Sequence, residues 1–144
     1  MQSFPHYYRV SSKADEESTV CLSSEGVPDI ESAPPVEFGG PGDKWSPEAL
    51  LVSAIADCFI LSFRAIARAS KLDWQSINCE VEGVLDKEGR VIKFTSFNVK
   101  ASLLIQDAQN TDQAKRLLEK AEQVCLISNS LSGPVHLEAQ VHCS

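Results

Sequence analysis

The chain has 144 residues, of which 43% are hydrophobic, and it carries a formal net charge of −7. This length is enough for one domain with a substantial core, which we expect to span residues 1–144, and too short for two. The basic residues form no run, so we expect no nucleic-acid partner and no binding to an anionic membrane surface, because both require a basic patch.

The N-terminal residues 1–6 have neither a basic region nor an apolar segment of the kind found in signal peptides. No stretch approaches the roughly 20 apolar residues that cross a bilayer. We therefore expect a cytoplasmic protein without a membrane-spanning segment. In that reducing compartment the cysteines are expected to be free thiols. They are Cys21, Cys58, Cys79, Cys125 and Cys143.

Metal-binding patterns are missing from these cysteines and from the histidines. There is no CxxC motif, and the histidines show no zinc-ligand spacing with the cysteines. The sequence therefore predicts no metal site and no cofactor.

Two short strands are expected first, over residues 6–13 and 18–24, with a third near 29–37. Residues 26–45 are rich in proline and glycine, so much of this segment is expected to be irregular. A glycine-rich loop before a helix invites a phosphate-binding interpretation. The P-loop pattern is absent, however, and a structural loop is the better interpretation.

A long helix is predicted from Ser46 to about Lys71. Ser46 can cap it, Pro47 suits the first helical position, and Glu48 places a negative charge at the positive end of the dipole. Apolar residues nearly encircle this helix, which is typical of a buried central helix. In so small a domain, that burial requires a sheet on one side and favours a partner chain on the other.

The remaining elements are strands over 77–85, 90–94 and 97–105, a helix that starts at Thr111, and a last strand over 135–143. The alternation of apolar residues defines the strands, and helical spacing of apolar residues defines the helix. The predicted fold class is α+β with mainly antiparallel sheet, since hairpins outnumber crossovers.

Cys58 and Cys125 lie on the apolar stripes of the two predicted helices, far apart in the sequence. Such a pair can be a buried redox couple if both thiols face the same interior. It can equally be two ordinary core cysteines, because buried cysteine is common in protein cores. The residues alone leave both interpretations open.

Four short motifs, however, resemble those of the OsmC/Ohr family of thiol peroxidases. They are Glu37-Phe38-Gly39-Gly40, Ser46-Pro47-Glu48-Ala49-Leu50-Leu51, Ala56-Asp57-Cys58-Phe59 and Cys125-Leu126-Ile127-Ser128-Asn129. Their order and spacing match from about residue 22 to the end of the chain. The resemblance implies an α+β fold with a long buried central helix, in an intertwined homodimer whose active sites lie at the subunit interface.

The same resemblance implies an organic hydroperoxide reductase that works without metal or haem. By position Cys58 would be the peroxidatic cysteine and Cys125 the resolving cysteine, and Glu48 would hold a catalytic arginine over the thiolate. The implied reductant is a dithiol, in several family members a lipoylated protein.

Helix geometry adds a constraint on this assignment. Glu48 and Cys58 are ten residues apart on one predicted helix, so they lie about 15 Å apart along its axis and roughly 80° apart around it. Their side chains cannot meet within one subunit. If Glu48 serves the thiol of Cys58, it does so from the other chain across a two-fold axis.

Three positions depart from the family pattern. The position of the family arginine aligns with Glu17, and the nearest upstream cations are Arg9 and Lys13. Asp57 stands where a small neutral residue is usual, and the polar stripe predicts that it points outward. Leu126 replaces a proline that commonly follows the second cysteine.

These departures keep two alternatives open. One is a diverged, non-catalytic member that acts as a thiol redox sensor or binds an apolar ligand. The other is a purely structural dimer with inert thiols. Arg64 and Arg68 are expected to be surface or interface charges, although either could replace the missing arginine from a second chain.

Overall fold

The structure, a computed structural model, describes residues 1–144 as two compact units, Met1–Leu51 and Val52–Ser144. The expected single domain over residues 1–144 stays a prediction.

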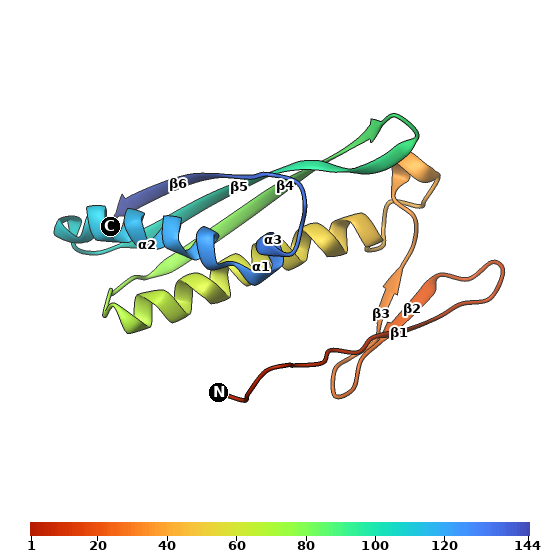
Figure 1. Cartoon of the computed structure of the whole chain (residues 1–144), viewed down its shortest axis with the longest axis horizontal. Coiled ribbons are helices and arrows are strands. Elements are labelled where there is room, and N and C mark those ends of the chain that lie inside the picture. Colours follow the sequence, from red (N-terminus) through yellow and green to blue (C-terminus); the bar gives the residue numbers. More distant parts are fainter. The chain divides into compact units, whose positions relative to one another are not determined.

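The first unit contains a small antiparallel sheet, in the order β1-β2-β3 (Figure 1). Its strands are β1 (Ser11–Lys13), β2 (Val20–Ser23) and β3 (Ile30–Ser32). The first expected strand was too long: β2 ends in a turn after Ser23, so residues 6–10 have no strand opposite them. The third was also too long, because Pro34 and Pro35 cannot donate to a sheet and the 3-10 helix η1 (Val36–Phe38) follows.

The long helix α1 (Pro47–Ala69) starts as predicted. The Oγ of Ser46 accepts a hydrogen bond from the N–H of Ala49 at 3.1 Å, and Glu48 lies in the first turn. The helix ends within two residues of the expected end. Lys71 then adopts a φ of 56°, a left-handed conformation that stops the helix.

The second unit contains a larger sheet, in the order β4-β5-β6. Its strands are β4 (Ser76–Glu88), β5 (Val91–Ile105) and β6 (Val135–Cys143). β4 and β5 form one long antiparallel hairpin with a bulge at Val84/Leu85, so the residues expected in strands over 90–94 and 97–105 belong to a single strand. β6 runs parallel to β5, because the helices between them carry the chain back to the other end of the sheet.

Three short elements connect β5 to β6: η2 (Ala108–Asn110), α2 (Thr111–Val124) and α3 (Leu126–Asn129). The start of α2 agrees with the sequence, but α3 was not expected. Cys125 lies between α2 and α3 with φ −61° and ψ 108°, an extended conformation. The prediction that it belongs to the stripe of the second helix is therefore wrong.

One hydrophobic core is built from α1, the sheet and α2. Alternate residues of β5 contribute to it from the sheet, and α2 contributes Ala114, Leu118 and Ala121. The side chains of α1 that are fully buried there are Ile55, Phe59, Phe63 and Ala67.

These four side chains form one face of α1, which packs into the core as expected. Burial of the other face by a partner chain stays a prediction. By length and composition alone, α1 is also long and apolar enough to cross a membrane, since its mean hydropathy is 1.9. We did not expect such a helix from the sequence. A core helix of this length passes the same test, and one face of α1 packs into the core.

The burial of α1 predicts that two side-chain truncations on this helix lower the free energy of unfolding by different amounts. Phe59→Ala is expected to lower the free energy of unfolding by about 3–5 kcal/mol, because a ring that is 1% exposed leaves a cavity. Leu61→Ala, at a side chain that is 50% exposed, is expected to cost less than about 1 kcal/mol. Urea denaturation at one fixed protein concentration measures both. Equal costs would contradict the assignment of the buried face.

Candidate active site

The side chain of Cys58 lines an open cavity of about 430 Å³ in the second unit. The cavity lies between α1 and the start of α3, and most of its lining is apolar. The lining residues are Ala54, Asp57, Cys58, Leu61, Ser62, Leu126 and Ile127. Leu61 and Leu126 are 50% and 66% exposed, so the walls as well as the thiol are open to solvent. A small apolar molecule could therefore reach the sulfur.

The pKa of Cys58 lies below its ordinary value. Burial raises it, but hydrogen bonds that favour the thiolate outweigh burial. They come from the backbone of Ile127, the Cys125 side chain, the Ser62 hydroxyl and the backbone of Leu126. The Sγ–Oγ distance to Ser62 is 3.9 Å. At neutral pH a larger fraction of Cys58 is therefore thiolate than for a cysteine with an ordinary pKa.

Cys125 is fully buried, and its side chain is hydrogen-bonded to that of Cys58. Burial raises the pKa of Cys125, and hydrogen bonds from Ser128 lower it. The hydrogen bond to Cys58 and the negative charge of Cys58 raise it further. The net direction is upward, so Cys125 is the protonated partner of the pair. The structure therefore brings the two predicted cysteines together, with opposite shifts.

The position of Cys125 depends on the break between α2 and α3. A helix that ends there leaves carbonyl groups without partners. The Nδ2 of Asn129 donates to the carbonyl of Gln123 at 3.0 Å, and the N–H of Asn129 donates to the carbonyl of Cys125 at 3.0 Å. Asn129, the last residue of the fourth motif, thus stabilises the bend at Cys125.

Sequence reasoning did not place Cys79 near the other two thiols. Cys79 packs against the core from β4, beside Ala101 of β5. Burial, and then the negative charge of Cys125, raise its pKa from an ordinary 9.0 to about 11. The alternation of Ile77, Cys79 and Val81 along the strand indicates that their side chains share one face of the sheet. No sequence signal indicates that Cys79 lies near Cys125.

Glu48 lies in the first turn of α1, ten residues before Cys58 on the same helix, so one chain does not bring the two side chains together. Its Oε1 is buried and has no hydrogen-bond partner. It borders a small, mostly apolar hollow of about 250 Å³ in the first unit, lined also by Val20, Ser32 and Phe38. A buried carboxylate oxygen without a partner is costly, which indicates that a donor is missing from the single chain.

Arg64 and Arg68, which lie in the same unit as the two thiols, are exposed, and neither bonds to a thiol. Arg9 and Lys13, in the first unit, are also exposed. The guanidinium of Arg9 lies 5.7 Å from the ring centre of Tyr7. Asp57 is exposed, as expected from the polar stripe.

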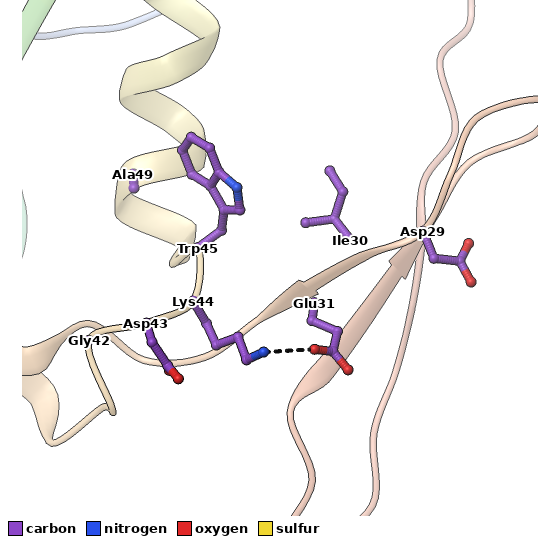
Figure 2. A pocket seen from close by; sticks show the side chains of 8 residues that line it. All are labelled: Asp29, Ile30, Glu31, Gly42, Asp43, Lys44, Trp45 and Ala49. Atoms are coloured by element: carbon purple, nitrogen blue, oxygen red, sulfur yellow. Dashed lines mark hydrogen bonds and ion pairs between the residues drawn. The ribbon is translucent and has the colours of Figure 1, made fainter.

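A larger hollow, of about 760 Å³, lies in the first unit and contains no thiol. Figure 2 shows its acidic and aromatic lining, with Lys44 paired to Glu31 and the indole of Trp45 pointing away from this pair. The Lys44–Glu31 distance is 3.0 Å. It is open and broad, and no unpartnered group points to a ligand in it. The Cys58 cavity is therefore the better candidate site, although it is smaller.

A sequence model of the OsmC-like protein family matches residues 40–140, which include both thiols and Glu48. The chain belongs to the OsmC-like protein family. The chain is 30% identical over 109 residues to the uncharacterized protein YmaD of Bacillus subtilis, covering 74% of this chain and 73% of YmaD.

Solved structures of OsmC-like proteins share the fold. One, an OsmC-like protein of unknown function from Vibrio cholerae, has a TM-score of 0.81 at 18% identity and covers 95% of this chain and 99% of that chain. Another, an organic hydroperoxide resistance protein OsmC from Legionella pneumophila, has a TM-score of 0.75 at 23% identity and covers 97% and 99%. These neighbours confirm the predicted OsmC-like α+β fold.

The pKa directions of this OsmC-like protein predict the order in which its thiols react. Alkylation follows the thiolate fraction, so its rate rises with pH and levels off above the pKa of each thiol. We expect the midpoint of Cys58 labelling to lie below the ordinary thiol pKa of 9.0 and the midpoint of Cys79 labelling to lie near pH 11. Iodoacetamide labelling between pH 5 and pH 11, followed by peptide-resolved mass spectrometry, measures both. Labelling of Cys79 before Cys58 would contradict the described environments.

Proposed function

We propose that this protein is a thiol-dependent peroxidase that reduces organic hydroperoxides to alcohols. The observation that carries the proposal is the pair of hydrogen-bonded thiols with opposite pKa shifts, Cys58 lowered and Cys125 raised, beside an accessible, mostly apolar cavity. Membership of the OsmC-like family supports it, because relatives of the same fold include proteins named for organic hydroperoxide resistance.

The chemistry follows from the two thiols. The thiolate of Cys58 attacks the distal oxygen of the peroxide, the O–O bond breaks, and the alkoxide leaves with a proton as the alcohol. Cys58 becomes a sulfenic acid. The thiol of Cys125 then attacks that sulfur, water leaves, and a Cys58–Cys125 disulfide forms. A dithiol reductant restores both thiols by exchange and is itself oxidised to a disulfide.

The environment of each cysteine suits its step. Cys58 needs to be a thiolate and accessible, and it lines the open cavity with a lowered pKa. Cys125 is fully buried, which protects it from direct oxidation until the sulfenic acid forms beside it. The apolar walls formed by Leu61 and Leu126 favour an alkyl peroxide over hydrogen peroxide.

We place Glu48 in the site from a second copy of the chain. Its buried, unpartnered Oε1 requires a donor, and helix geometry keeps it from Cys58 of its own chain. A homodimer that pairs the open apolar faces of two α1 helices would supply both requirements. The proposed reductant is a dithiol carrier such as a lipoylated protein, and the proposed location is the cytoplasm.

Removal of the proposed nucleophile gives the first test. Cys58→Ser is expected to abolish the consumption of cumene hydroperoxide in the presence of dihydrolipoamide, because serine cannot form a sulfenic acid. Cys143→Ser, at an exposed cysteine outside the cavity, is the matched control and should keep full turnover. A Cys58→Ser protein with wild-type turnover would exclude the mechanism.

Removal of the resolving thiol should change the product formed on the protein. In Cys125→Ser the sulfenic acid of Cys58 has no partner, so further peroxide is expected to oxidise it to sulfinic acid. Intact mass after one equivalent of peroxide should show a loss of two hydrogens in the wild type and a gain of one oxygen in the variant. Two or more equivalents should add a second oxygen to the variant. If the variant forms the same two-hydrogen loss, another thiol resolves Cys58.

The alternative function is a thiol sensor or apolar-ligand binder without turnover. It is favoured by the lack of any basic residue among the groups that lower the pKa of Cys58. The two functions differ in catalysis: a sensor would form the disulfide once, whereas a peroxidase consumes many equivalents of peroxide for each protein chain when a dithiol is supplied.

A further inference from the structure

We propose that uncharged donors of its own chain hold the sulfur of Cys58 as an anion in this protein: the hydroxyl of Ser62 and the peptide N–H groups of Leu126 and Ile127. We call these three groups the Cys58 donor set. The inference rests on the proposed function and deepens it, because it names the positioning groups of the reacting sulfur.

Ser62 lies one helical turn after Cys58 on α1. Its Oγ is 3.9 Å from the Sγ of Cys58, and both side chains line the same cavity. A thiolate can only accept a hydrogen bond, so the hydroxyl must be the donor when Cys58 is ionised. Ser62 therefore stabilises the charged form.

The peptide groups come from the other wall of the cavity. Leu126 and Ile127 both line it, and the backbone of each is hydrogen-bonded to Cys58. They are the first two residues of α3, so their N–H groups have no acceptor within that helix. The extended conformation of Cys125 ends α2 just before them. Ser62 and these peptide groups thus approach the sulfur from two separate elements.

Stabilisation of the thiolate by the Cys58 donor set differs from stabilisation by a cation in its dependence on salt. A cation that stabilises an exposed thiolate acts through a charge that salt screens. Hydrogen bonds from neutral groups act at contact distance and depend little on ionic strength. The ionisation of Cys58 should therefore be nearly independent of salt concentration.

The peptide N–H of Leu126 can be removed by a single substitution. Proline at position 126 lacks the N–H, and proline is favoured at the first position of a helix. The preceding residue, Cys125, is already extended, which is the conformation that a following proline requires. Leu126→Ala removes the side chain, which is 66% exposed, and keeps the N–H, so it is the matched control.

The test is the pH profile of Cys58 alkylation by iodoacetamide, resolved by peptide mass spectrometry, in the full-length protein. We expect Ser62→Ala and Leu126→Pro each to move the midpoint to higher pH and to slow labelling at pH 6.5 by about three- to tenfold. Leu126→Ala and Ser62→Thr, which keep the donors, should retain the wild-type midpoint. Unchanged resistance of Cys79 at pH 8 reports that each variant is folded.

Unchanged midpoints in both Ser62→Ala and Leu126→Pro would overturn the proposal. So would a wild-type midpoint that rises steeply between 20 mM and 500 mM KCl. The screening length falls from about 20 Å to about 4 Å over this range, so such a rise would assign the role to a cation. Peroxide turnover is measured separately on the same proteins. Shifted midpoints without any turnover in the wild type would refute the proposed function and leave the donor set standing.

Discussion

The hydrogen bond between the thiols of Cys58 and Cys125 is the interaction on which the candidate site depends. It joins α1 to the end of α2, two elements separated in the chain by the long β4–β5 hairpin. Because one thiol is accessible and the other buried, the same contact makes Cys58 more acidic and Cys125 less so. In the mechanism proposed above, this difference in acidity gives Cys58 the role of the nucleophile and Cys125 that of the proton-bearing partner.

That contact is possible because the second helix does not continue through Cys125. A continuous helix would satisfy the carbonyl of Gln123 internally and would turn the peptide groups of residues 126 and 127 along its own axis. The bend instead leaves these N–H groups for Cys58, and the side-chain amide of Asn129 satisfies the carbonyl. The local arrangement thus links a backbone irregularity to the ionisation of a thiol on another helix.

The composition of α1 has a second consequence. Only one of its faces is buried in the core, although its mean hydropathy of 1.9 is high enough for a membrane span. Exposed apolar residues on a helix of a folded domain commonly mark an interaction surface. The buried oxygen of Glu48, which lacks a partner, lies in the first turn of the same helix. Both features fit a site that is completed by another chain.

The sequence by itself determined the elements whose signals are local. The cap and first turn at Ser46–Glu48, the alternation of the long strands and the start of α2 depend on neighbouring residues, and all were confirmed. The four motifs also identified the family and both thiols. Strand lengths near residues 6–10 and 33–37 were wrong because pairing partners, not propensity, decide where a short strand ends.

Only the tertiary structure decided how the thiols are arranged. No local pattern indicated α3, the extended conformation of Cys125 or the parallel pairing of β6 with β5, because each depends on contacts between distant segments. The hydrogen-bond donors around Cys58 and the position of Cys79 near Cys125 also depend on such contacts. The sequence named the two cysteines, and the packing of α1 against the α2–α3 bend set their opposite ionisation, since a pKa depends on burial and on hydrogen bonds that only the folded chain provides.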